Sequence, residues 1–170
     1  MGVLYVYLVY LLGIRLLKHQ NAALIAAFAF SVDGLNFVQS RTGMNDIYYV
    51  TFFLVSLLLL LNKRFIFSAI FLGLALSSKW ASVYAYLIFI PLLLKDKQYR
   101  QILFFMIIPP LIYLISYSPF FLLGHTLDQF KQLQQQMWWY HTNLKANHAY
   151  TSPWWSWPLN LYPVWYFVDY

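Results

Sequence analysis

The sequence predicts an all-α integral membrane protein, a multi-span bundle of hydrophobic helices, from three observations. The chain of 170 residues is 62% hydrophobic and 22% aromatic, with a mean hydropathy of +0.59. Only 9% of its residues are charged, against roughly 25% in a soluble domain. The apolar residues form successive runs, and the bases gather in alternate breaks between them. The lipid bilayer is therefore the expected solvent for most of the chain.

Six apolar runs are expected to form the membrane helices. They cover residues 3–17, 22–37, 47–61, 65–76, 81–94 and 102–121. Several are shorter than the ~20 residues that cross a hydrocarbon core of ~30 Å, so flanking polar residues should lie in the interface. Pro109 and Pro110 remove two backbone donors and should kink the last run.

The bases predict the orientation of the bundle. Breaks one, three and five hold seven of the eleven bases, namely Arg15, Lys18, Lys63, Arg64, Lys95, Lys97 and Arg100. Breaks two and four hold one base each, Arg41 and Lys79. Because cytoplasmic loops carry an excess of Lys and Arg, the three basic breaks should face the cytoplasm. Arg41, Asp46 and Lys79 should then face the outer side.

The residues after the sixth run predict a loop with an amphipathic helix over 126–144. At about 100° per residue, one face of this helix holds Phe130, Leu133, Met137, Tyr140 and Leu144. Such a helix should lie along the outer interface. We therefore assign six transmembrane helices to 1–121 and an outer loop to 122–157. Residues 158–170 would begin a further, truncated transmembrane region, so the chain is expected to be a fragment.

Three charged residues at the outer end each have two interpretations. The Arg41 guanidinium suits bidentate capture of a phosphate, or it is an interfacial anchor paired with Asp46. Lys79 is a point-charge partner for a lipid phosphate, or it extends to water in the same way. Asp33 is either a hydrated residue near a helix end or a structural or substrate contact.

The remaining composition excludes several classes of site. The bases are scattered among apolar runs, which argues against a nucleic-acid surface. The chain has no cysteine, and His141 and His148 have no interleaved carboxylate, so neither a metal nor a cofactor is expected. The tryptophans predict an aromatic belt at the interface, or alternatively a sugar-stacking surface.

Several motifs together resemble the protein O-mannosyltransferase family. In that family a Met-containing amphipathic stretch leads into His-Pro-Tyr-x-Ser and then a Trp-Pro pair; the matching stretches here are MWWYHTNL at 137–144, HAYTS at 148–152 and WSWP at 155–158. The stretch from Asp33 through Ser40-Arg41 to Asp46 looks like its Ser-Arg…Asp motif, and Lys79-Trp80 looks like its Lys-Trp motif. Ala149 stands where the family has proline. The large insertion of eukaryotic members is absent, which favours a bacterial form.

The resemblance implies a helix bundle of the GT-C glycosyltransferase type in the bacterial plasma membrane. Such an enzyme transfers mannose from polyprenyl-phosphate-mannose to Ser or Thr of a secreted or membrane protein at the extracytoplasmic face. The substrate-binding residues it implies are Arg41, Asp46, Lys79, His148, Tyr150, Ser152 and Trp157. The family's catalytic base is an acid in an outer loop that would precede this segment. No catalytic residue is therefore assigned, and the isolated chain is not expected to turn over.

Two other functions stay open. A related enzyme could move another lipid-phosphate sugar, such as aminoarabinose, or use lipid A as acceptor. A non-enzymatic transporter or assembly segment is the second alternative. A transporter should place polar residues near the middle of the membrane, often at broken helices, whereas here the polar residues collect at one rim.

Overall fold

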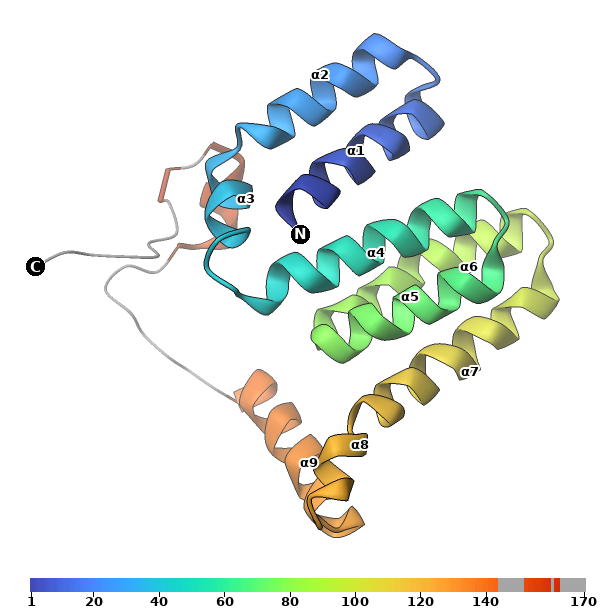
Figure 1. The fold of residues 1–170 in the computed structure, drawn as a ribbon, viewed down its shortest axis with the longest axis vertical. Coiled ribbons are helices and arrows are strands. Elements are labelled where there is room, and N and C mark those ends of the chain that lie inside the picture. Colours follow the sequence, from blue (N-terminus) through green and yellow to red (C-terminus); the bar gives the residue numbers. More distant parts are fainter. Residues whose placement is uncertain (144–151, 160, 163–170) are drawn as a thin grey trace, which may run out of the picture. The chain divides into compact units, whose positions relative to one another are not determined.

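A computed structural model describes residues 1–143, 152–159 and 161–162 of the chain. Every regular element in these ranges is helical, which confirms the predicted all-α class (Figure 1). The chain divides into two units, Met1–Leu122 and Leu123–Tyr170, each described by itself. The first unit contains α1 (Gly2–Leu17), α2 (Gln20–Ser31), α3 (Gly34–Gln39), α4 (Asn45–Leu61), α5 (Phe65–Ser78), the 3₁₀ helix η1 (Trp80–Ala85), α6 (Tyr86–Lys95), α7 (Tyr99–Ser116) and α8 (Ser118–Leu122). The second contains α9 (Leu127–Asn143) and the 3₁₀ helix η2 (Trp154–Leu159).

The predicted helix over 22–37 is wrong as a single element. The Asp33 carboxylate accepts the backbone N–H of Asn36 at 2.9 Å, so Asp33 is the N-cap of α3. An aspartate in this position satisfies an N–H group that has no partner inside the helix. The cap separates α3 from α2, so Asp33 makes a structural contact and its side chain is also exposed, as a hydrated residue near a helix end should be.

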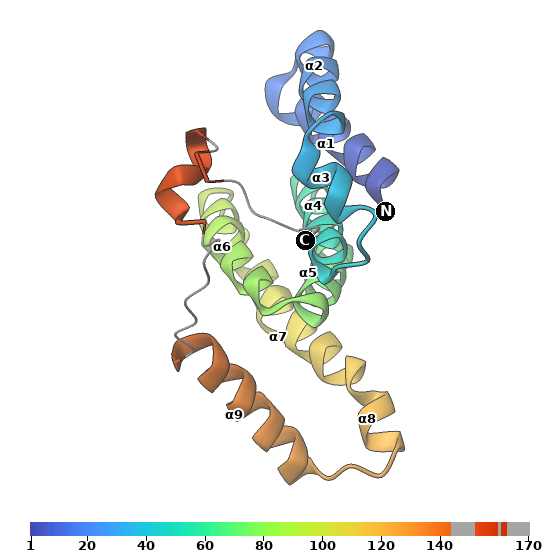
Figure 2. The same cartoon turned by 90° about the vertical axis from the view of Figure 1, so that its left-hand side faces the viewer.

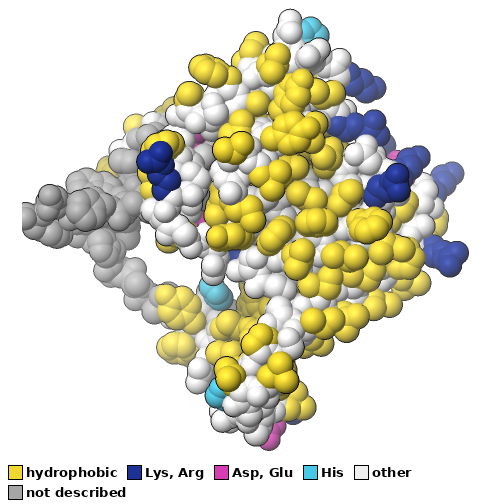
Figure 3. Space-filling view, in the orientation of Figure 1, with side chains coloured by type: hydrophobic (Ala, Val, Ile, Leu, Met, Phe, Trp, Pro, Cys, Tyr) yellow, Lys and Arg dark blue, Asp and Glu magenta, His cyan; other side chains and the backbone are white. Residues whose placement is uncertain are grey.

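Consecutive helices of the first unit form antiparallel hairpins. The α1–α2, α4–α5 and α6–α7 turns lie at one end of the unit, where Lys and Arg side chains gather (Figures 1 and 3). The opposite end holds helix α3, the start of α1 and the junction between α5 and η1. This end faces the viewer in Figure 2. The charge pattern of the breaks therefore correctly predicts which turns share an end.

Helix α5 is the centre of the first unit and packs against both α4 and α7. Its buried residues are Ser68, Ala69, Leu72, Gly73 and Ala75. A Cβ on Gly73 would lie 2.8 Å from Cβ of Ile112, so α5 and α7 approach too closely for any larger residue. Small residues at such contacts let helix backbones meet in membrane bundles.

Two serines join α4 to α5 in the core. The Ser56 hydroxyl donates to the carbonyl of Ser68 and the Ser68 hydroxyl donates to the carbonyl of Ser56, each at 2.7 Å. Both side chains are fully buried. Each of these buried hydroxyls therefore has its hydrogen-bond partner on the neighbouring helix.

Helix α7 continues through both of its prolines. Because Pro109 has no N–H, the carbonyl of Phe105 one turn earlier lacks its helical donor. The Tyr86 hydroxyl donates to this carbonyl at 2.6 Å, and it comes from the first residue of α6. A side chain of the neighbouring helix thus restores the hydrogen bond that the proline removes, as apolar surroundings require.

One helical stretch, Tyr99–Leu122, is long and apolar enough to cross a membrane by length and composition, with 24 residues. The other apolar helices of the described residues have 10–17 residues. At ~1.5 Å per residue even the longest of these reaches ~26 Å, short of a ~30 Å hydrocarbon core. Apolar side chains nevertheless cover much of the surface of the helices (Figure 3). The six-span topology stays a prediction.

Replacing Tyr86 with phenylalanine should lower the free energy of unfolding by about 1–3 kcal/mol, because the Phe105 carbonyl would lose its donor. Unfolding in detergent micelles followed by circular dichroism measures this change. Tyr84→Phe is the matched control, since Tyr84 lies in the adjacent η1 and is 70% exposed. Equal stability of the two variants would contradict the role given to the Tyr86 hydroxyl.

Candidate functional site

An ion pair joins the two helices that meet at the end opposite the basic turns. Asp46 lies in the first turn of α4, and Lys79 follows the last residue of α5. Because the two helices are antiparallel, these ends adjoin, and Lys79 Nζ lies 2.5 Å from Asp46 Oδ1. The Tyr49 ring faces the same ammonium, 5.6 Å from its centroid. The pairing of Asp46 with Arg41 that we considered is therefore wrong, since the partner of Asp46 is Lys79.

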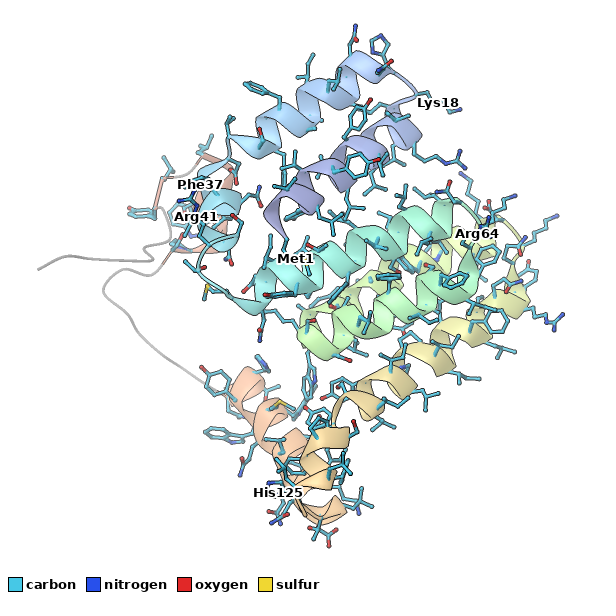
Figure 4. The ribbon with its side chains drawn as sticks, in the orientation of Figure 1. Met1, Lys18, Phe37, Arg41, Arg64 and His125 are labelled. Atoms are coloured by element: carbon cyan, nitrogen blue, oxygen red, sulfur yellow. The ribbon has the colours of Figure 1, made fainter. Side chains whose placement is uncertain are left out.

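Arg41 follows α3 at the same end and points over an aromatic ring. Its guanidinium carbon lies 4.1 Å above the centroid of Phe37, one helical turn earlier (Figure 4). Gly43, with φ of +64°, turns the chain between Arg41 and α4. Among the described residues, no carboxylate lies within ion-pair distance of the guanidinium. Arg41 is exposed and available to an external anion.

A hollow of about 400 Å³ adjoins Arg41, between the start of α1, the end of α2 and α3. Its lining comprises Met1, Gly2, Val3, Tyr5, Val6, Phe30, Ser31, Asn36, Phe37, Ser40 and Arg41. Most of these side chains are apolar, and Arg41 is the charged one. Mostly apolar pockets of this size with a few polar groups are typical of small-molecule sites.

A chain of hydrogen bonds holds the residue next to Lys79. The Trp80 indole N–H donates to the Tyr113 hydroxyl at 2.9 Å, and the hydroxyls of Tyr113 and Tyr117 lie 3.1 Å apart. This chain ties the start of η1 to α7, and it therefore fixes the turn that presents Lys79 to Asp46. Tyr113 and Tyr117 were not predicted as site residues. The signal for them was a pair of tyrosine hydroxyls one helical turn apart near the end of the apolar run 102–121.

The other predicted site residues belong to the second unit. His148 and Tyr150 lie outside the described residues, as does the side chain of Trp157. The Ser152 hydroxyl donates to the carbonyl of Tyr162. In the described part of the chain, the structure brings together Asp46 and Lys79, and it places Arg41 at the same end. It assigns no position to the others relative to these three.

The predicted amphipathic helix is present as α9. His141, in its last turn, lies edge-on to the Tyr140 ring with 5.6 Å between centroids. Within the described ranges, no group of three or more His, Asp or Glu residues could hold a metal ion. The position of α9 along a membrane interface stays a prediction.

Residues 1–123 match the family described as dolichyl-phosphate-mannose-protein mannosyltransferase. The chain belongs to this family. It is also similar to the polyprenol-phosphate-mannose–protein mannosyltransferases of Mycolicibacterium smegmatis strains mc(2)155 and MKD8. Each is 26% identical over an alignment 243 residues long, which covers 99% of this chain and 47% of the relative. The chain thus spans about half the length of these curated relatives. No solved structure matches it.

The matched region of this mannosyltransferase family nearly coincides with the first structural unit, Met1–Leu122. It contains Arg41, the Asp46–Lys79 pair and the Trp80–Tyr113–Tyr117 chain. The family expected from the motifs is therefore confirmed.

Trp80→Phe and Tyr113→Phe should be coupled energetically, because each removes one side of the same hydrogen bond. A double-mutant cycle on unfolding in micelles should give a coupling of about 0.5–1.5 kcal/mol. Pairing Trp80→Phe with Tyr99→Phe is the control, since Tyr99 is 61% exposed at the far end of α7. Additive effects in the first cycle would refute the hydrogen bond's contribution.

Proposed function

We propose that this chain forms the lipid-donor part of a membrane mannosyltransferase. The full enzyme would transfer mannose from polyprenyl-phosphate-mannose to Ser or Thr hydroxyls of secreted or membrane proteins. The family supports the reaction class, and the names of the mycobacterial relatives support this donor and a protein acceptor. We place the active end at the extracytoplasmic face of a bacterial plasma membrane, since the three basic turns lie at the other end.

The reaction makes one bond and breaks one. The acceptor oxygen bonds to C1 of mannose while the bond from C1 to the phosphate oxygen breaks, with inversion at C1. The hydroxyl proton passes to a general base, and the lipid phosphate leaves with the bonding electrons. Cationic donors that hold this phosphate stabilise the charge that develops on the leaving oxygen.

The observation that carries the proposal is the environment of Arg41. Its guanidinium has no carboxylate partner among the described residues, and Phe37 supports it from one side. It borders a mostly apolar hollow of about 400 Å³. A fork of N–H donors beside an apolar wall suits a phosphate that carries a polyprenyl chain.

In the proposed site, Lys79 has a different role from Arg41. Its ammonium is already held by Asp46 at 2.5 Å, so it contributes less free charge than Arg41. We assign Arg41 to the phosphate and the Asp46–Lys79 pair to the sugar hydroxyls, because the pair offers both donors and an acceptor. His148, Tyr150, Ser152 and Trp157 remain proposed contacts for sugar or acceptor.

The general base is not assigned to either acid at this end. Asp46 accepts a bond from Lys79, and Asp33 accepts the N–H that caps α3. Both carboxylates thus have structural partners. We place the base outside the described residues, and we expect the chain to bind the donor without transferring its sugar.

Arg41→Met should weaken binding of polyprenyl-phosphate-mannose by about 10–100-fold, the equivalent of losing a hydrogen-bonded charge pair of about 1.5–3 kcal/mol. Filter binding of the radiolabelled lipid to the chain in nanodiscs measures this loss. Lys131→Met is the control, because it removes a positive charge from an exposed site on α9, outside both the hollow and the basic turns. An unchanged affinity in Arg41→Met would remove Arg41 from the phosphate site.

A panel of lipid-phosphate sugars separates the proposal from its alternatives. Polyprenyl-phosphate-mannose and unglycosylated polyprenyl phosphate should both displace the radiolabelled donor from the site. A lipid-phosphate aminoarabinose should displace it more weakly. Preference for aminoarabinose would favour the lipid A enzyme. The transporter alternative has less support, because the buried hydroxyls of Ser56 and Ser68, between α4 and α5, are bonded to each other's residues rather than open to a substrate.

A further inference from the structure

The end of the first unit opposite the candidate site carries a cationic surface that the proposed function does not use. We call it the basic-turn surface, and it consists of Arg15, Lys18, Lys63, Arg64, Lys95, Lys97 and Arg100. All seven residues are exposed, and they come from three turns and the helix ends beside them, at one end of the unit (Figures 3 and 4). One acidic residue, Asp96, lies between Lys95 and Lys97 in the sequence.

Three of these lysines have a backbone conformation that favours glycine. Lys18, Lys63 and Lys97 have φ of +54°, +59° and +56°. They are the non-glycine residues with positive φ in the part of the chain that the structure describes. Elsewhere in that part, the two residues with positive φ are both glycines, Gly43 and Gly124. A side chain at such a position costs free energy that glycine avoids.

The same helix ending recurs in two of the turns. After α4, the N–H of Lys63 donates to Leu60 and that of Arg64 to Leu59, at 2.9 and 2.8 Å. After α6, the N–H groups of Lys97 and Gln98 donate in the same pattern to the carbonyls of Leu94 and Leu93, at 3.1 and 2.8 Å. This is the Schellman motif, in which the left-handed residue is most often glycine. Lysine fills that position in both turns.

The fold itself does not use the charges of these lysines. Among the described residues, no carboxylate lies within ion-pair distance of the ammonium groups of Lys18, Lys63 and Lys97. Arg15 differs, because its guanidinium donates to the carbonyl of Leu61 at the end of α4, at 2.9 Å. One explanation for lysine at these positions is attraction between its charge and the negative end of the helix dipole. This attraction would act whether or not anionic lipid is present.

We propose that the basic-turn surface binds the headgroups of anionic phospholipids, with Lys18, Lys63 and Lys97 as its principal contacts. The apolar helices end at these turns, so in a bilayer the lysines lie at the depth of the lipid phosphates. Clustered bases beside membrane helices attract anionic leaflets. Lysine in place of glycine at three turns then reflects selection for charge at that depth. Among the described residues of the first unit, the opposite end carries the two bases Arg41 and Lys79, and the charge of Lys79 is offset by Asp46.

The test measures lipid retention by the whole chain. The protein is purified in mild detergent, mixed with phosphatidylglycerol and phosphatidylcholine, and the retained lipids are counted by native mass spectrometry. The wild type should retain phosphatidylglycerol preferentially. Each Lys→Gln change at positions 18, 63 and 97 should weaken that preference by about fivefold, the ratio that corresponds to about 1 kcal/mol per surface lysine.

Matched variants separate charge from backbone strain. Lys→Gln keeps a side chain in the left-handed conformation and removes the charge, whereas Lys→Arg keeps the charge. The Arg variants should retain the preference, and Lys131→Gln, which removes a charge from α9 outside the basic-turn surface, should leave it unchanged. The three changes are made singly, and circular dichroism verifies that each variant folds. A Gln variant with the wild-type preference, as the helix-dipole explanation predicts, would overturn the proposal.

Discussion

The close contact between α5 and α7 is the constraint on which the first unit depends. Gly73 leaves no room for a larger side chain, because the Ile112 side chain of α7 packs directly against its backbone. On its other side α5 meets α4 through the reciprocal hydrogen bonds of Ser56 and Ser68. In lipid there is no hydrophobic force between helices, so contacts of these two kinds must supply the association. The position of Lys79, immediately after α5, follows from this packing.

The candidate site inherits its geometry from the same helices. Packing of α4 against α5 brings Asp46 to Lys79, and packing of α5 against α7 brings Trp80 to Tyr113. Both pairs are separated by 33 residues in the sequence. Arg41 differs, because α3 and the turn at Gly43 carry it away from Asp46 despite their proximity in sequence. The result is one engaged cation and one available cation at the same end.

The sequence could predict properties that depend on composition and on short spacing. The apolar runs predicted the helices, the alternation of bases predicted which turns share an end, and the spacing of Phe130, Leu133 and Met137 predicted α9. The motifs predicted the family. The division of the 22–37 run was missed, because the cap at Asp33 interrupts an otherwise continuous apolar pattern.

The partners within the site could not be predicted in the same way. Two cations, Arg41 and Lys79, were available to Asp46, and the choice depends on how the chain turns at Gly43 and on which helix ends adjoin. The Tyr86 hydroxyl likewise meets the Phe105 carbonyl only because α6 packs beside α7. Interactions of this kind depend on tertiary contacts between distant residues. No local pattern specifies them.

The lengths of the helices have a consequence for the surrounding membrane. Hydrophobic stretches of 10–17 residues are shorter than an average bilayer is thick. A bilayer compensates for such a mismatch by thinning around the protein, at a modest free-energy cost per ångström. Around the first unit, the two leaflets would therefore approach each other, and the hollow beside Arg41 would adjoin a locally compressed hydrocarbon layer. Thin membranes should consequently accommodate this protein better than thick, sterol-rich ones.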